Sequence, residues 1–217
     1  MTQDIEKFKD YERAHWRFFL ELEQEMLATR KYVDFDEKNF STFSIEYLKL
    51  FQAVCGEIDI LGKVIAQELD SSFKPDDGKN NIFKWWFIVQ SWFDNQKSIE
   101  FCRMASFQPW AGFEVEQYRD SRGAIRYRLK SGSQTPSWWR AYTSVKHQRT
   151  LKDSSGNLNY TKANLGNLCN AFSALYLLEK AFLSELGNKE ALAKMGNSVL
   201  FEPMSQSYVK GSTLIIG

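Results

Sequence analysis

The chain has 217 residues, which is enough for one or two domains. Its 43% hydrophobic and 25% charged content supports a packed core and excludes a wholly disordered protein. Because the N-terminus is polar and no apolar run approaches about 18 residues, we expect no signal peptide, no membrane span and a cytoplasmic location.

The net charge of +1 conceals an uneven distribution. Residues 119–152 carry nine basic side chains against the single acid Asp120, a local charge of +8, which leaves −7 for the rest of the chain. Such polarity predicts an anionic partner for the basic region. The alternative is that basic and acidic surfaces complement each other within a dimer.

Cysteine and histidine usage gives no sign of a metal. Cys55, Cys102 and Cys169 lie in apolar, helix-like patterns without zinc or disulfide spacing, so we expect buried thiols in a reducing compartment. The two histidines are 132 positions apart and no carboxylates cluster, so a metal site would need ligands from distant segments. There is no glycine-rich phosphate loop either. The sequence therefore predicts no cofactor and no metal.

Residues 3–31 show the periodicity of one long amphipathic helix. Its apolar stripe consists of Phe8, Tyr11, His15, Phe18 and Leu22. A histidine inside such a stripe is usually a core or interface residue, and a catalytic role is the alternative.

A second long helix is predicted over about 44–70, after a connection at 32–43, with Ser41 or Ser44 as its cap. Asp59 and Lys63 fall at the edge of its apolar stripe, as an i, i+4 pair. They either look into a cleft or form an ordinary flanking salt bridge. Glu57 is expected on the opposite side of the helix.

Residues 71–80 read as a loop, and a third helix is predicted over about 81–106. Its many aromatic side chains indicate core or dimer interface, with a base-stacking platform as the alternative. The stretch 113–130 then predicts an inserted β-hairpin. One face of its second strand is basic, which suits either a protected edge strand or a ribbon that contacts phosphates. The basic side chains are Arg126, Arg128 and Lys130.

Two further helices are predicted. The helix over 136–150 begins at Thr135-Pro136, and a long, mostly apolar helix over about 161–187 is expected to be central, with Gly187 as its stop. Glu179 lies in the apolar stripe of that helix, where a buried acid needs a partner. The tail 195–217 is irregular, apart from a β-prone run at 213–216.

The segment Trp138–Arg149 carries the strongest functional signal. Arg140 and His147 are seven residues apart, so on a helix they lie within about 20° of each other, and Ser144 shares their face. An arginine, a hydroxyl and an imidazole on one stripe have the chemistry to hold a phosphate and move a proton. A solvated helix surface is the alternative, with Arg140 paired to Glu179 or to Asp59.

The motif Trp139-Arg140-x-Tyr142-x-x-Val145-Lys146-His147-x-Arg149, followed by Ala163-Asn164-Leu165-x-Asn167-x-x-Asn170-Ala171, resembles the HEPN superfamily of all-α domains. The hallmark of that superfamily is an arginine and a histidine separated by four to six residues on one helix. Here six residues separate them, and Ala141 stands where active members often have a polar residue. The segment 55–59 with Lys63 also resembles the acidic helix of some prokaryotic members. The resemblance covers roughly residues 3–187.

The resemblance implies a mainly α fold, a single domain over 1–217 that forms a four-to-five-helix bundle. The hairpin 113–130 would be an insertion, and 195–217 a C-terminal extension. It also implies a homodimer in which paired Arg140 and His147 cut RNA without a metal, in a toxin or phage-defence context, with an antitoxin as a possible partner.

In that mechanism His147 would act as general acid or base and Arg140 would stabilise the phosphate. We expect Ser144, Tyr142 or Lys146 to orient the phosphate, and Asp59 to fix the imidazole tautomer. Non-specific RNA affinity would come from the basic hairpin residues and Arg149. The alternative function is a non-catalytic module that binds a nucleotide, an RNA or a partner protein.

Overall fold

The structure, a computed structural model, describes residues 2–76, 81–187, 192 and 196–201. Its α-helices are α1 (Thr2–Tyr11), α2 (Arg17–Thr29), α3 (Ile45–Leu69), α4 (Ile82–Val89), α5 (Ser137–Gln148) and α6 (Leu165–Leu186). Its strands are β1 (Ile99–Phe101), β2 (Ala105–Phe107), β3 (Val115–Arg119) and β4 (Ile125–Leu129). Three short helical segments are η1 (Glu12–Trp16), η2 (Glu37–Asn39) and η3 (Asn159–Lys162). The protein is therefore mainly helical with an antiparallel β3–β4 hairpin, as predicted, and it has a second strand pair, β1–β2, that was not predicted.

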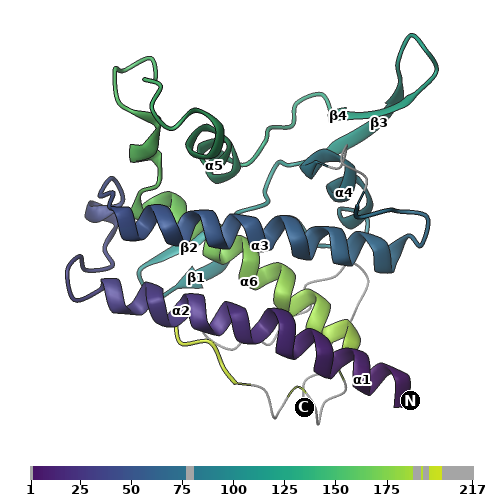
Figure 1. Cartoon of the computed structure of the whole chain (residues 1–217), viewed down its shortest axis with the longest axis horizontal. Coiled ribbons are helices and arrows are strands. Elements are labelled where there is room, and N and C mark those ends of the chain that lie inside the picture. The colour runs from purple at the N-terminus through teal and green to yellow at the C-terminus, as the bar shows by residue number, and fades with distance from the viewer. Residues whose placement is uncertain (1, 77–80, 188–191, 193–195, 202–217) are drawn as a thin grey trace.

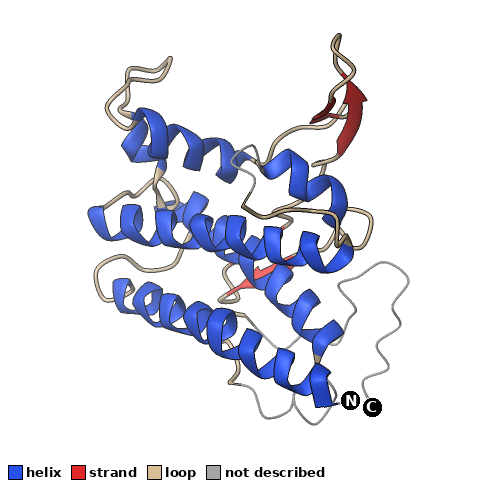
Figure 2. Ribbon diagram, turned by 45° about the vertical axis from the view of Figure 1, so that its right-hand side comes forward, coloured by secondary structure: helices blue, strands red, loops and turns tan. Residues whose placement is uncertain are grey.

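The helices stack in levels. Helices α1 and α2 run along the bottom of Figure 1, α3 lies above them, α6 crosses behind, and α5 lies on the other side of α3. The β1–β2 pair lies among the helices, whereas the β3–β4 hairpin projects away from them (Figure 2). None of the described helices is long and apolar enough to cross a membrane.

Helix α6 is the central helix, as its apolar sequence predicts. It contacts α1, α3 and α5, and the buried hydrophobic side chains of the described chain form one continuous cluster around it. The side chain of Asn164 caps its start by accepting the N–H of Asn167 at 3.0 Å, and Gly187 ends it. Helix α3 starts in the same way, at Ser44.

The long N-terminal helix contains a π-helical turn, Glu12–Trp16, which the sequence does not reveal. A π turn adds a residue to the helix and so rotates everything after it relative to what precedes it. Phe18 is 41% exposed as a result, and Phe19 is fully buried in its place. The predicted stripe is therefore right at Phe8, Tyr11 and Leu22 and wrong at Phe18.

The helix predicted over 81–106 is wrong beyond Val89. Gln90 caps the end of α4, and its side-chain amide donates to the Val115 carbonyl at 2.7 Å and accepts the Val115 N–H at 2.9 Å. The chain then forms β1 and β2, joined at Cys102 and Arg103, which both have positive φ. Cys102 thus lies in a tight turn, not in a helix.

The aromatic side chains of this region belong to the core, not to a base-stacking platform. Trp85 and Trp86 are fully buried, and Trp86 stacks on Trp110 with ring centroids 4.3 Å apart. The indole N–H of Trp86 donates to the Phe113 carbonyl at 2.9 Å, which leaves no polar group of the ring unmet.

The segment 196–201 packs back onto the N-terminal helix. Glu23 is fully buried and accepts hydrogen bonds from the Ser198 hydroxyl and from the N–H groups of Val199 and Leu200, at 2.9 and 3.0 Å. The ring of Phe201 stacks on Tyr176 with centroids 4.3 Å apart. The predicted β-prone run at 213–216 lies outside the described residues.

Candidate functional site

Helix α5 presents Arg140 and His147 to solvent on one face, as the spacing predicts. Its opposite face is buried, and this fixes the direction of the pair away from the core. The buried residues are Trp138, Ala141, Tyr142 and Val145. The helix begins one residue later than expected, with Pro136 as the cap in place of Thr135. Within one chain, the pair therefore lies on an open surface.

The Arg140 and His147 side chains are available for a ligand. Neither forms an ion pair within the described residues, so the alternative pairing of Arg140 with Glu179 or Asp59 is wrong. The Ser144 hydroxyl donates to the Arg140 carbonyl at 3.0 Å. Ser144 can consequently accept a hydrogen bond from a ligand without rearrangement, but it cannot donate one.

Tyr142 does not lie beside Arg140. It is buried, its ring contacts Phe51 edge-on with centroids 6.2 Å apart, and burial raises its pKa to about 12. The Lys146 ammonium lies 5.4 Å from the centroid of this ring. Both residues are therefore on the flank of α5, and a role for Tyr142 in orienting a phosphate at Arg140 does not fit.

Asp59 and Lys63 form the flanking salt bridge that was one of the two expectations for them. The Lys63 ammonium lies 2.6 Å from the Asp59 carboxylate, whose other oxygen accepts the Trp85 indole N–H at 3.0 Å. Helix α3 does pack beside α5. With both of its oxygens engaged, however, Asp59 does not hold the imidazole of His147.

A polar pocket of about 190 Å³ lies beside Arg140, between the first turn of α5 and α6. The Oδ1 atom of Asn170 is buried there without a hydrogen-bond partner among the described residues. Gln134, Thr135 and Ser137 add further polar groups. The Arg140 end of the motif therefore has a recess that can take a small polar group.

The hairpin cations are largely offset by acids. Register places Glu116 directly opposite Arg128, and their side chains lie 2.8 Å apart. Arg126 pairs with Asp120 at 2.9 Å, and Lys130 with Glu114 at 2.7 Å. The hairpin is thus a charge-paired ribbon, and its expected RNA contacts would have to displace these acids.

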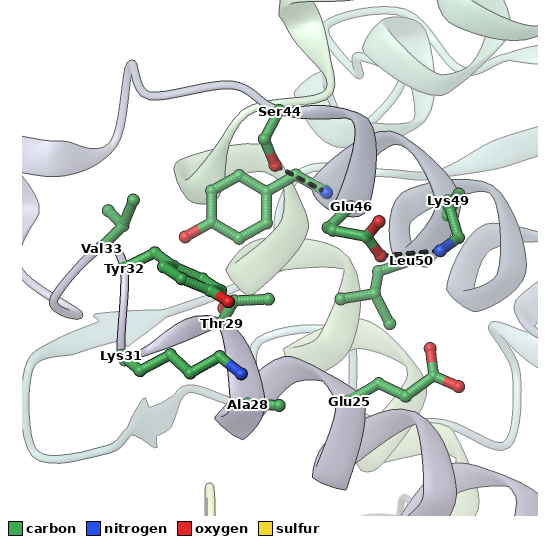
Figure 3. A pocket seen from close by; sticks show the side chains of 11 residues that line it. Glu25, Ala28, Thr29, Lys31, Tyr32, Val33, Ser44, Glu46, Lys49 and Leu50 are labelled. Carbon is green, nitrogen blue, oxygen red and sulfur yellow. Dashed lines mark hydrogen bonds and ion pairs between the residues drawn. The ribbon is translucent and has the colours of Figure 1, made fainter.

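A larger groove of about 650 Å³ separates the end of α2 from the start of α3 (Figure 3). Figure 3 shows Ser44, Glu46 and Lys49 on the α3 side, facing Thr29 and Tyr32. None of the predicted site residues lines this groove. Its acidic and basic side chains are mixed, so it offers no net charge to select an anion.

A second group of reactive side chains is buried where η1, α3 and α6 meet. The Nδ1 atom of His15 lies 2.5 Å from the Glu57 carboxylate, and the Tyr11 hydroxyl donates to Glu179 at 2.8 Å. Ligand atoms of His15, Glu57 and Glu179 all lie within 4.8 Å of one another. The expectation that Glu57 points away is wrong, because α3 is covered by helices on more than one side.

The environment of Glu179 opposes its ionisation. Burial raises the pKa of Glu179 to about 8, and the negative charge of Glu57 acts in the same direction, against the hydrogen bond from Tyr11. Burial and the nearby Glu179 raise the pKa of the Tyr11 hydroxyl well above its usual value. At neutral pH the Glu179 carboxyl group is therefore largely protonated in the absence of a positive partner.

The sequence contains a feature that could have predicted the contact between His15, Glu57 and Glu179, but only if the helices are considered together. His15 and Glu179 each occupy the apolar stripe of a helix, and two ionisable residues on buried faces usually meet, because neither can be buried alone. The π turn that brings His15 toward Glu57 leaves no such trace in the sequence. The chain matches no protein-family model, no curated protein and no solved structure.

Proposed function

We propose that the chain is a metal-independent endoribonuclease of the HEPN type, acting as a homodimer, with Arg140 and His147 as its catalytic residues. The observation that carries the proposal is the exposure of both side chains on one face of α5, without an ion pair to any described residue. Both side chains are thus free to meet a phosphate, whereas side chains held in ion pairs would first have to be released. The mainly helical fold is compatible with a HEPN-like bundle.

The reaction would be transfer of a phosphodiester within RNA. The ribose 2′-oxygen attacks the adjacent phosphorus while the bond to the 5′-oxygen breaks, which leaves a 2′,3′-cyclic phosphate and a 5′-hydroxyl. One imidazole takes the proton of the 2′-hydroxyl, and another gives a proton to the leaving oxygen. Arg140 would bind the non-bridging oxygens and stabilise the charge that develops on them.

A second copy of the chain is required by this chemistry. Each chain brings one His147, whereas the reaction uses an acid and a base. The Arg140 face also points away from its own core, so only another molecule can supply the opposite wall of a cleft. A two-fold pairing of α5 with α5 would meet both needs, since such an interface is self-complementary.

RNA affinity would come more from the end of α5 and the residues that follow it than from the hairpin. Lys146, Arg149 and Lys152 form no ion pair within the described residues, in contrast to the paired cations of β4. Free cations release counterions when they bind a phosphate backbone, whereas paired ones must first give up an acid. The pocket beside Arg140 would take part of a nucleotide next to the scissile phosphate.

The test is cleavage of labelled, mixed-sequence RNA by the protein and by His147→Ala, with and without EDTA. We expect a loss of about 100-fold or more for His147→Ala, because general acid–base catalysis contributes at least that factor. Gln148→Ala is the matched control, since Gln148 is the exposed neighbour on the same helix. Products should end in 2′,3′-cyclic phosphates.

Equal cleavage by the wild-type protein and His147→Ala would overturn the proposal. So would RNA that is bound by a folded dimer but never cut, a result that identifies the non-catalytic binding module instead. Circular dichroism in EDTA shows whether the chelator affects the fold.

A further inference from the structure

The buried group at η1, α3 and α6 contains a polar atom that the protein does not satisfy. Glu179 is fully buried, and its Oε1 atom has no hydrogen-bond partner among the described residues. Its other oxygen accepts the Tyr11 hydroxyl. A buried carboxylate oxygen without a partner is strongly destabilising, and such atoms are rare in native proteins.

A proton on Glu179 changes what this oxygen needs without supplying it. A carboxylic acid has an O–H that must itself find an acceptor, whereas the one hydrogen bond shown for this carboxyl group comes from the Tyr11 hydroxyl to the other oxygen. The adjacent Glu57 carboxylate is already engaged by His15. A positive ion shared by the two carboxylates and the imidazole would give the unpartnered oxygen of Glu179 a partner.

We infer that His15, Glu57 and Glu179 bind a divalent transition-metal ion such as Zn²⁺. One imidazole nitrogen and two carboxylate oxygens are ligands that such ions accept, whereas Ca²⁺ and Mg²⁺ prefer oxygen alone. Two carboxylates and a neutral imidazole also neutralise a divalent charge, which a buried ion requires.

The geometry is close to what such an ion needs. With metal–ligand bonds of about 2.0–2.2 Å, tetrahedral ligand atoms lie about 3.4 Å apart. The ligand atoms of the three residues lie within 4.8 Å of one another, and His15 Nδ1 lies 2.5 Å from Glu57 Oε1. An ion would increase the distance between His15 and Glu57 and bring ligand atoms that are more than 3.4 Å apart closer together. Rotation about the side-chain bonds of these residues is sufficient for both changes.

The surroundings support the three ligands. The Tyr11 hydroxyl holds one oxygen of Glu179, as residues next to metal ligands commonly do. The Tyr11 ring also lies against the His15 ring, with centroids 4.8 Å apart, and limits its rotation. His15 is partly exposed, which provides the route of entry.

The ion would have a structural role. Residues 15, 57 and 179 come from three helices that are distant in sequence, and two of the three ligands are buried. Binding to the native state alone would stabilise the fold by mass action. This role is independent of the ribonuclease proposal, because the group lies in the core and the Arg140 face lies on the surface.

The first experiment measures metal content and melting temperature of the full chain, before and after treatment with a chelator. We expect one ion per chain after addition of Zn²⁺, a higher Tm that EDTA reverses, and visible absorption bands when Co²⁺ replaces Zn²⁺. Absence of stoichiometric binding, of a Tm shift and of Co²⁺ bands would overturn the inference and leave a hydrogen-bonded network.

Variants locate the ion. Glu179→Gln keeps the size of the side chain and His15→Gln keeps a polar one, and both should lose the Tm shift and the Co²⁺ bands. Glu46→Gln, at an exposed position of α3, should keep them. If Glu179→Gln and His15→Gln bind as wild type does, the ion is elsewhere and the inference fails. Absence of Co²⁺ bands from the wild-type protein overturns the inference even if a variant does not fold.

Discussion

Replacing Gly62 with alanine tests how closely α3 and α4 pack. A Cβ atom at Gly62 would lie 2.6–2.7 Å from three carbon atoms of the Trp85 indole. Carbon atoms in van der Waals contact are about 3.5–4.0 Å apart, so the ring would have to retreat by about 1 Å. Trp85 is fully buried, and its contacts with two other tryptophan rings leave no space for such a movement.

The expected free-energy change combines three effects. Overpacking a core costs about 1–3 kcal/mol. Displacing Trp85 also breaks its hydrogen bond to Asp59, a loss of about 1 kcal/mol. Alanine is a better helix former than glycine by about 1 kcal/mol, which offsets part of this. Gly62→Ala should therefore lower the free energy of unfolding by about 1–3 kcal/mol.

Gly56 provides the matched control, because it lies on the same helix and a Cβ there would meet nothing within 4 Å. Gly56→Ala should raise the free energy of unfolding by about 0.5–1 kcal/mol. Urea denaturation followed by far-UV circular dichroism measures both. The reasoning is refuted if the two substitutions have the same sign, or if Gly62→Ala leaves the tryptophan fluorescence of the native state unchanged.

Two further predictions concern buried groups. Glu23→Gln removes a charged acceptor of three hydrogen bonds and should lower stability by about 1–3 kcal/mol. Limited proteolysis should then cut the C-terminal region faster, and an unchanged rate would contradict the role given to Glu23. Burial raises the pKa of Cys102 to about 11 and also holds the pKa values of Cys55 and Cys169 well above the usual value, so a thiol reagent at pH 8 should label the folded protein slowly and the unfolded protein fully. Rapid labelling of the native protein would show that a thiol is accessible as thiolate.

The elements with a single, strong periodicity could be predicted from the sequence. The N-terminal helix, α3, α6 and the β3–β4 hairpin all lie close to their expected ranges. The shared face of Arg140 and His147 follows from helix geometry alone, and its exposure follows from the apolar residues opposite.

The failures have specific physical causes. The chain beyond Val89 leaves the helix and packs instead through tertiary contacts, such as the two hydrogen bonds between the Gln90 side chain and the distant backbone of Val115. Glu57 is buried because a helix covered on several sides has no single outward face. The positive charge on the basic face of β4 is offset because the strand register places Glu116 opposite Arg128. None of these contacts can be read from the local pattern of residues.

The docking of residues 196–201 onto the N-terminal helix has a consequence for how the chain folds. Trp16 bonds to the carbonyl of Gly196, 180 positions away, and Glu23 bonds to Ser198, 175 positions away. Contacts of such sequence separation close nearly the whole chain into a loop and slow the search for the native state. During synthesis the Glu23 carboxylate stays without these hydrogen-bond partners until residues 198–200 have left the ribosome.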